Sequence, residues 1–444
     1  MSDLKPLIGP IGWLTFIYVP LLLMAGGGGS PAPLSELFCQ VLAALALIAW
    51  VGLQGQRTAT ATLLWVTGLI LAPLIIQLIP LPPQLWHRLP GRDLVVDVLR
   101  LVEANAHWRP LSVAPQRTLE ALLSLLPPLL AMHLTASLSV GERQRLLAIL
   151  AAFAILSIAV GAGQIAASGT GPLDFYAGAE PGVLFGFQAN RNAQVDVLLI
   201  GLLAAVAAWH GQARRSRAAA GIVGMLALVL LLGATLTRSR AGIALAPVAL
   251  AWCLALRPWQ LPNDSTVRKP LVLTGVLVAT AGLVALVAQS RAIKHTFDRF
   301  TFAGEYRPDI WQDTAFAIRQ FWPIGSGIGT FTRAIGPAER LEAIRPILPN
   351  RAHNEYLELL LEAGVLGAAA WIAVIALVVT AAHRGLAGVS TVPLPQAVFA
   401  AGTLSIVTLH SLVDYPLRSM ALAGLVGVAA ALVLAPPRCG AQKI

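Results

Sequence analysis

Ionisable residues are scarce in this sequence, and their scarcity excludes an ordinary soluble domain. Asp, Glu, Lys and Arg make up 12% of the 444 residues, whereas hydrophobic residues make up 57%. Soluble domains carry about 25% charged residues, because a surface exposed to water needs them. Together with a mean hydropathy of +0.74, this composition indicates an integral membrane protein.

Cysteine is nearly absent as well, which excludes further classes. Cys39 and Cys253 lie in apolar stretches, and Cys439 lies near the C-terminus. This spacing provides neither a disulfide framework nor a structural metal site. The net charge of +10 does not indicate nucleic acid binding, since the arginines are scattered through short connections and form no soluble basic face.

Long apolar runs are abundant instead. A helix of about 20 apolar residues spans the hydrocarbon core of a bilayer, and twelve runs of this kind recur along the chain. They cover residues 11–25, 34–53, 61–79, 118–138, 146–167, 195–209, 219–236, 241–256, 271–288, 357–379, 397–412 and 421–434. We therefore expect an all-α polytopic membrane protein, with residues 1–444 forming a single membrane domain.

The distribution of basic residues orients these spans. If both termini are cytoplasmic, the cytoplasmic segments carry most of the basic residues in short connections, as the positive-inside rule requires. These residues are Arg57, Arg143, Arg145, Arg214, Arg215, Arg217, Arg268, Lys269, Arg384, Arg438 and Lys443. The first run follows Lys5 without a small-residue cleavage site, so we expect a retained helix and not a signal peptide.

Two polar segments are long, and both face outward on this topology. Residues 80–117 contain Trp86 and Trp108, which we interpret as interfacial anchors. Residues 289–356, between the ninth and tenth spans, are too polar for lipid and too short for a separate domain, so we expect a lid. Within this lid, residues 308–321 place their apolar side chains on one stripe, which predicts an amphipathic helix.

Three arginines break the positive-inside pattern. Arg191 precedes the sixth span, and Arg238 and Arg240 lie in the tight connection between the seventh and eighth spans. An ionisable residue at membrane depth is costly and usually has a partner. Because a guanidinium binds phosphate oxygens in a bidentate way, we interpret these arginines as an anion site. The alternative is snorkelling toward lipid headgroups, and it is strongest for Arg238.

A histidine stands at the start of the tenth span. A continuous helix over residues 351–364 places His353 on one face and Glu355, Glu358 and Glu362 on the other. The dipole at a helix N-terminus disfavours the imidazolium, so this ring is expected to be neutral and able to accept a proton.

The residues around His353 suggest supporting roles. Asn354 is expected either to cap the helix or to orient the ring. Glu358 and Glu362 are expected to pair with arginines of the lid. The other histidines, His410 among them, are interpreted as interfacial side chains.

Together these elements resemble the signature of the bacterial O-antigen ligase and polymerase superfamily. The resemblance covers residues 186–417 and rests on several motifs. They are Asn190-Arg191-Asn192, Thr237-Arg238-Ser239-Arg240-Ala241-Gly242, Trp311, Pro323-Ile324-Gly325-Ser326-Gly327, His353-Asn354-x-Tyr356-Leu357 and Glu362-x-Gly364-x-x-Gly367.

This resemblance implies a GT-C-like, inverting glycosyltransferase that needs neither a metal nor another cofactor. The donor would be a glycan on undecaprenyl diphosphate, at the periplasmic face of the bacterial inner membrane. By motif, Arg191 and Arg240 would bind the diphosphate, with Arg238 as a weaker candidate, and His353 would assist transfer. Asn190, Asn354 and Tyr356 would support these residues.

The acceptor stays open at this stage. It would be lipid A core for a ligase, another lipid-linked repeat for a polymerase, or a protein hydroxyl for a protein glycosylase. The polar segment 80–117 and the Asn-Arg-Asn element favour polymerases of exopolysaccharide clusters. The alternatives outside catalysis are a transporter or flippase for lipid-linked sugars and a membrane scaffold; a matching pair of broken helices, typical of many transporters, is not evident.

Overall fold

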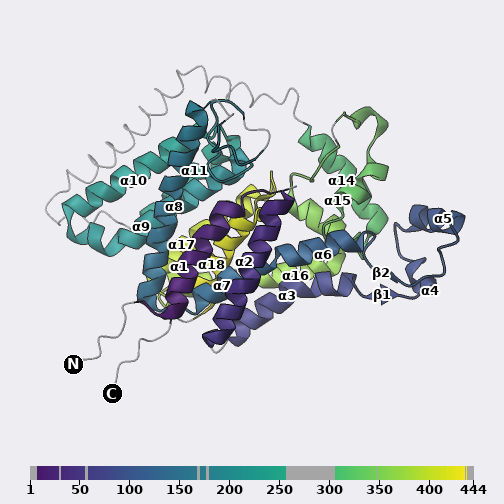
Figure 1. The fold of residues 1–444 in the computed structure, drawn as a ribbon, viewed down its shortest axis with the longest axis horizontal. Coiled ribbons are helices and arrows are strands. Elements are labelled where there is room, and N and C mark those ends of the chain that lie inside the picture. The colour runs from purple at the N-terminus through teal and green to yellow at the C-terminus, as the bar shows by residue number, and fades with distance from the viewer. Residues whose placement is uncertain are drawn as a thin grey trace. The chain divides into compact units, whose positions relative to one another are not determined.

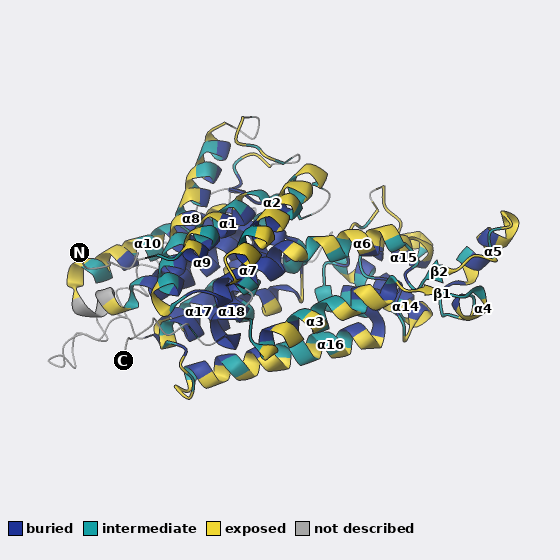
Figure 2. Ribbon diagram, turned by 60° about the horizontal axis from the view of Figure 1, so that its bottom comes forward, coloured by how far each residue is buried: buried dark blue, intermediate teal, exposed yellow. Residues whose placement is uncertain are grey.

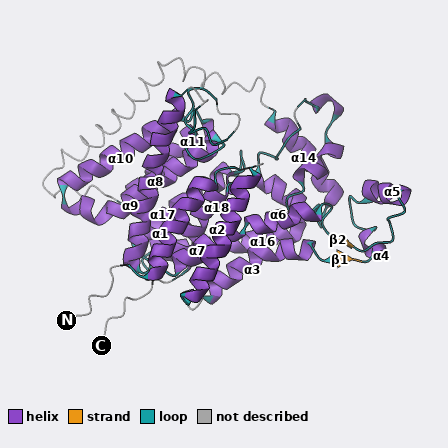
Figure 3. Ribbon diagram, in the orientation of Figure 1, coloured by secondary structure: helices purple, strands orange, loops and turns teal. Residues whose placement is uncertain are grey.

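The computed structural model describes residues 8–29, 32–55, 59–167, 171–176, 180–256, 306–346, 348–435 and 437. Within these residues the chain is helical except for loops and one small antiparallel ribbon, formed by β1 (Pro80–Leu81) and β2 (Arg109–Pro110) (Figure 3). The chain divides into two compact units, Met1–Arg143 with Tyr306–Ile444, and Gln144–Glu305. Each unit is described by itself.

Apolar helices occur at eleven of the twelve expected spans. The ninth, residues 271–288, lies outside the described residues. Six helical segments are long and apolar enough to cross a membrane, by length and composition: Pro33–Gly52, Pro115–Ala136, Val140–Ala166, Arg191–Gly211, Arg217–Leu236 and Glu355–Leu386. Five shorter apolar helices are Pro10–Ala25, Ala61–Gln77, Arg240–Ala255, Leu394–His410 and Met420–Leu434. An all-α membrane protein is thus confirmed, while the number of twelve spans stays a prediction.

The exposed surfaces of these helices are apolar, as a lipid-facing surface must be. Trp65 is 68% exposed and Leu366 is 65% exposed, although both are large hydrophobic side chains. Figure 2 shows long exposed stripes on α2 (Pro33–Gly52), α3 (Ala61–Gln77) and α16 (Glu355–Leu386). In water such exposed apolar stripes would promote aggregation, whereas in a bilayer they contact the lipid chains favourably.

In the first unit, α18 (Met420–Leu434) packs against α1 (Pro10–Ala25), α7 (Leu126–Ala136), α16 and α17 (Leu394–His410) (Figure 1). Arg143, near the start of α8 (Val140–Ala166), is fully buried and stabilises this packing. Its guanidinium donates to the carbonyl of Ala136 at 3.1 Å and to that of Ala435 at 3.0 Å. The residue therefore satisfies carbonyls at the C-terminal ends of α7 and α18.

In the first unit, the helices that follow residue 306 pack on α16. The helix expected at residues 308–321 is present as α14 (Arg307–Phe321), and it buries Ile310, Ala317 and Phe321 in a cluster shared with α15 (Phe331–Ile335) and α16. The short 3-10 helices η2 (Gly336–Ala338) and η3 (Leu341–Ala343) follow. Residues 289–305 of the expected lid lie outside the described residues, so the lid stays a prediction.

Residues 80–110 form a small excursion at the end of α3, with α4 (Pro83–Trp86) and α5 (Asp93–Leu101) between the two strands (Figure 1). Trp86 is only 2% exposed and packs with Val96 and Leu99. Its indole N–H donates to the carbonyl of Pro110 at 2.7 Å. The interpretation of Trp86 as an interfacial anchor is therefore wrong, because the ring is the core of this excursion; Trp108 is 64% exposed. The chain returns to the bundle through α6 (Pro115–Ser124).

In the second unit, α9 (Arg191–Arg215) packs against α10 (Arg217–Leu236) and α11 (Arg240–Ala255). In the apolar part of α9, within Arg191–Gly211, 89% of the residues are buried, whereas the next most buried candidate span, Pro115–Ala136, has 50%. A Cβ at Gly201 would lie 2.3 Å from the Cβ of Ala154. This glycine thus permits the close approach of α8 to α9.

Candidate functional site

The N-terminus of α16 is capped by Asn354. The side-chain oxygen of Asn354 accepts from the backbone N–H groups of Tyr356 at 3.0 Å and Leu357 at 3.1 Å. Of its two expected roles the structure shows the cap. The helix begins at Glu355, so His353 precedes it. The predicted placement of His353 on a face of this helix is therefore wrong, because the helix begins only after the Asn354 cap.

The backbone of His353 is held in a strained conformation. Its φ is 50°, in the left-handed region that side chains with a Cβ rarely adopt. The preceding residue is fixed on both sides: the N–H of Ala352 donates to Glu358 Oε2 at 2.9 Å, and its carbonyl accepts from the indole N–H of Trp311 at 3.0 Å. Such strain persists only where the surroundings enforce it, and it is common at functional sites.

The imidazole of His353 lies against a buried carboxylate. His353 Nδ1 is 3.3 Å from Asp414 Oδ1, and the two side chains are 12% and 4% exposed. Tyr306 and Tyr415 contact the ring edge-on, with centroid distances of 5.8 and 5.0 Å. Within the described part of the chain, Nε2 makes no hydrogen bond. Nδ1 has no hydrogen bond to a described residue in this geometry, so Asp414 acts on the ring as a neighbouring charge at the Nδ1 side, and Nε2 is the other nitrogen available for proton transfer.

Asp414 is ionised in this environment. Burial alone would raise its pKa, but interaction with His353, with His410 and with Arg307 outweighs burial and lowers the pKa of Asp414 to about 2. His410 Nε2 lies 3.9 Å from Asp414 Oδ2 and is 1% exposed. His410 is thus a buried neighbour of the carboxylate, and its interpretation as an interfacial side chain is wrong. A fixed carboxylate beside Nδ1 favours the tautomer that accepts protons at Nε2.

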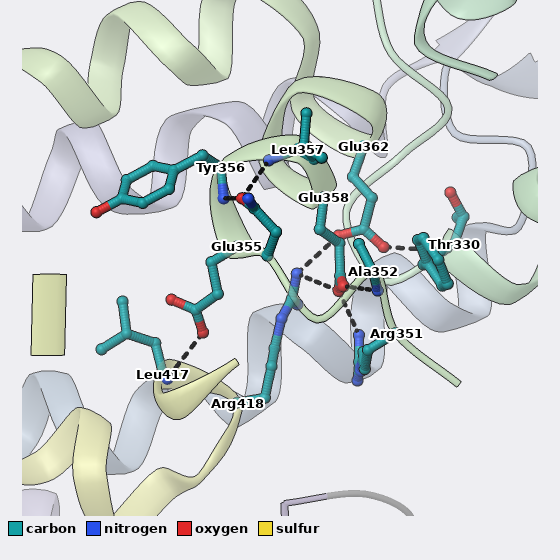
Figure 4. Close-up of polar contacts among 12 residues, drawn as sticks. Thr330, Arg351, Ala352, Glu355, Tyr356, Leu357, Glu358, Glu362, Leu417 and Arg418 are labelled. Atoms are coloured by element: carbon teal, nitrogen blue, oxygen red, sulfur yellow. Dashed lines mark hydrogen bonds and ion pairs between the residues drawn. The ribbon is translucent and has the colours of Figure 1, made fainter. Parts of the chain in front are cut away.

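A buried ion network lies at the first turns of α16 (Figure 4). Arg418 Nη2 is 2.9 Å from Glu358 Oε1 and 2.9 Å from Glu362 Oε2, and Arg351 Nη1 is 3.0 Å from Glu358 Oε1. Both carboxylates are fully buried. The expected pairing with lid arginines holds for Arg351, whereas the second arginine comes from η4 (Pro416–Arg418), between α17 and α18. The neighbouring carboxylates hold the pKa of Arg418 above its usual value despite burial.

The third glutamate binds the turn that carries Asp414. Glu355 accepts from the Ser411 hydroxyl at 2.9 Å through Oε2 and from the Leu417 N–H at 2.8 Å through Oε1. The Glu355 N–H also donates to the Ser411 carbonyl at 2.9 Å. The Tyr356 hydroxyl donates to the Thr408 carbonyl at 2.7 Å. The first turn of α16 is therefore fastened to residues 408–417.

The glycine-rich segment at residues 323–327 packs against a kink in α16 and donates hydrogen bonds to carbonyls that the kink leaves free. Gly364 has φ 59° and ψ −157°, and a Cβ there would lie 2.2 Å from the Pro323 carbonyl oxygen. The kink frees helical carbonyls, and the N–H groups of Ser326 and Gly327 donate to those of Leu361 and Glu362, each at 2.9 Å. These glycines are explained by close backbone approach.

In the second unit, the arginine motifs lie at two helix N-termini. Arg191 is the first residue of α9, and its Nη1 is 2.8 Å from Oε2 of Glu180, which is 55% exposed. The Asn190 side chain accepts from the Asn192 N–H at 2.7 Å. The Ser239 hydroxyl donates to Asn192 Oδ1 at 2.7 Å and also caps α11. This contact joins the N-terminal ends of α9 and α11.

Two further arginines flank that cap. Arg240 is the first residue of α11, and Arg238 has a φ of 51°. The Arg238 guanidinium packs against Gly182, where a Cβ would lie 3.0 Å from Nη2. Arginine side chains at the positive ends of two helix dipoles make a strongly electropositive region, which favours an anion. The structure thus brings the three arginines to one end of the second unit, while His353 belongs to the first unit.

Asp414 and Arg418 are functional candidates that sequence reasoning missed. Both lie in the short connection before α18, which the expected topology places outside. A cation at that position breaks the positive-inside pattern in the same way as Arg240 does. Arg418 was therefore detectable by the same signal, whereas the contact of Asp414 with His353 depends on tertiary structure.

The fold and these sites define a polytopic helical membrane protein with a histidine beside a buried carboxylate and a cationic region at helix N-termini. Residues 225–372 match the family model described as O-antigen ligase. This region contains Arg238, Arg240 and His353, and the match confirms the resemblance that the motifs indicated. No curated protein matches the sequence.

Proposed function

We propose that the protein is a membrane glycosyltransferase of the O-antigen ligase and polymerase type. It transfers a glycan from undecaprenyl diphosphate to an acceptor hydroxyl at the periplasmic face of the bacterial inner membrane. The observation that carries the proposal is a partly buried histidine, with an ionised carboxylate 3.3 Å from its Nδ1, inside the segment that matches the O-antigen ligase family. A membrane scaffold has no need of such a proton acceptor, and the turnover experiment below distinguishes a transporter.

His353 is the general base of the proposed reaction. As the acceptor oxygen attacks the anomeric carbon, Nε2 takes the hydroxyl proton and the bond from that carbon to the diphosphate oxygen breaks. Attack opposite the leaving group inverts the anomeric configuration. Asp414 stays ionised and stabilises the imidazolium that forms. General base catalysis of this kind contributes about 10²–10⁴-fold to the rate.

Arg191 and Arg240 bind the diphosphate of the donor, with Arg238 in a lesser role. Their guanidinium groups and the N-termini of α9 and α11 stabilise the negative charge that develops on the leaving group. Fixed cations of the protein carry out this task, so the proposed reaction requires no metal. The exposed Glu180 carboxylate that pairs with Arg191 is displaced by the donor.

The acceptor class is tested directly with purified protein in lipid nanodiscs, given an undecaprenyl-diphosphate oligosaccharide. Longer glycans in the absence of another acceptor identify a polymerase. Release of undecaprenyl diphosphate only after lipid A core is added identifies a ligase, and release only after protein is added identifies a protein glycosylase. Donor that binds but is not turned over with any acceptor contradicts the proposal and favours a transporter.

A further inference from the structure

We propose that the Glu358–Arg418 ion pair is a positioning link that sets the distance between His353 and Asp414. The inference rests on the proposed function, because it concerns the geometry of the proposed base. Glu358 bonds the segment that carries the histidine, and Arg418 belongs to the turn that carries the aspartate. Arg418 Nη2 lies 2.9 Å from Glu358 Oε1.

On the histidine side, one carboxylate fixes the loop. Glu358 accepts from the Ala352 N–H at 2.9 Å through Oε2 and pairs with Arg351 at 3.0 Å through Oε1. The residue after the histidine, Asn354, is fixed as the cap of the same helix. Only His353 lies between these two anchors, and its φ of 50° is the conformation that they enforce.

On the aspartate side, one guanidinium closes the turn. Arg418 follows Asp414 by four residues, and its Nη2 contacts Glu358 and Glu362 on successive turns of α16, each at 2.9 Å. At the other end of the turn, the Ser411 hydroxyl donates to Glu355 at 2.9 Å. The segment with Asp414 is therefore tied to the same helix that holds the histidine loop.

The pair is sensitive to substitution because its charges are buried. The Glu358 side chain is 0% exposed and that of Arg418 is 22% exposed. Removing one partner leaves the other with one ion pair fewer, since Glu358 keeps Arg351 and Arg418 keeps Glu362, and the buried charge must move to regain compensation. A displacement of about 1 Å at a catalytic group costs about 100-fold in rate.

The charged and titratable groups around the His353–Asp414 pair are His410, Arg307, Tyr306 and Tyr415, and Arg351 interacts with Tyr415. Arg351 also contacts Glu358, and it is kept in every variant below. If Asp414 moves away from the ring, the imidazolium that forms during transfer loses the carboxylate that stabilises it.

The experiment measures the reactivity of the His353 ring without any need for turnover. The protein in nanodiscs is treated with diethyl pyrocarbonate, which modifies neutral imidazole, and mass spectrometry follows the rate at His353 against pH. The variants are Arg418→Met, Arg418→Lys, Glu358→Gln and the neutral double variant Glu358→Gln with Arg418→Met. The matched control is Arg340→Met, which removes an ion pair to the buried Asp313 (2.6 Å) in the same unit.

We expect turnover to fall about 10- to 100-fold in kcat in Arg418→Met and Glu358→Gln, with little change in donor KM. The profile of modification rate against pH at His353 should also differ from that of the wild type, because Asp414 no longer holds its place beside the ring. Arg418→Lys should change both less, and the double variant no more than either single one, because both act on one link. The control should leave the profile and kcat unchanged.

An unchanged profile in Arg418→Lys and in the double variant, with folded protein, overturns the inference and makes the pair merely structural. Those two variants keep the test valid if a single charge removal prevents folding. Full turnover by His353→Ala defeats the proposed function instead. In that case the change in the profile still decides whether the link positions the ring.

Discussion

The candidate sites of the two units hold their ionisable residues in opposite ways. In the first, Glu358 and Glu362 are buried and bonded several times, and Arg418 alone contacts both carboxylates at 2.9 Å. In the second, Arg191 pairs with a carboxylate that is 55% exposed, and within the described residues Arg238 makes no ion pair. A closed network suits a group that must keep one geometry for proton transfer. A cationic region at helix ends suits a ligand that brings its own negative charge.

The largest effect is expected from substitution of His353, the proposed general base. His353→Ala should lower kcat by about 10²–10⁴-fold, because the acceptor hydroxyl loses its proton acceptor. The donor dissociation constant should change little, since the diphosphate is bound elsewhere. Steady-state release of undecaprenyl diphosphate, together with donor binding, measures both. His353→Gln is the isosteric control, and its full activity would assign the residue a structural role.

The second effect belongs to the arginine region. Arg240→Ala should weaken donor binding by about 10- to 100-fold, the equivalent of one lost charge-assisted contact. Arg240→Lys should recover part of the loss, because a point charge replaces a bidentate fork. Binding of an undecaprenyl-diphosphate glycan by fluorescence titration measures the change. Equal binding by wild type and Arg240→Ala would refute the assigned role.

The third effect is a pH dependence of stability in the first unit. The pKa of Asp414 is lowered to about 2 from its ordinary 3.8, so the folded state binds this proton less readily than the unfolded state. The resulting stabilisation, about 2 kcal/mol, is complete above about pH 4 and is lost as the pH falls toward 2. Thermal unfolding of wild type and Asp414→Asn should therefore converge at low pH. A constant difference from pH 6 to pH 2 would contradict the account.

The smallest effect concerns the exposed pair of the second unit. Glu180→Gln should strengthen donor binding by no more than about 3-fold, because an exposed ion pair contributes about 0–1 kcal/mol. The same titration used for Arg240 variants detects the gain, and Glu120→Gln, in the exposed pair with Arg117 of the first unit, is the matched control. A loss of binding in Glu180→Gln would show that the carboxylate supports the arginine and does not compete with the donor.

The sequence predicts the fold class well because hydropathy is local. A run of apolar residues must form a helix in lipid to satisfy its backbone, wherever it lies in the chain. The helix at 308–321 is also recovered, because its apolar stripe follows the helical period. Trp86 was misjudged because nothing in the sequence shows that Val96 and Leu99 fold back onto it.

The candidate site is predicted only in part. His353, Asn354 and the arginines stand out by position at the ends of apolar runs, where polar residues are informative. Asp414 lies about 60 residues after His353, and their contact requires α16 and α17 to pack antiparallel. The role of Gly364 is equally hidden, since the carbonyls freed at its kink are satisfied by a loop about 40 residues earlier.

The central claim is that one unit moves the proton and the other binds the diphosphate, and a single experiment on the two variants tests it most directly. Donor binding and single-turnover release of undecaprenyl diphosphate are measured, with a chelator present, for wild type, His353→Ala and Arg240→Ala. The account predicts that wild type turns over with the chelator, that His353→Ala binds normally but releases at least about 100-fold more slowly, and that Arg240→Ala binds weakly. Wild-type release by His353→Ala, or a wild-type rate abolished by the chelator, would contradict it.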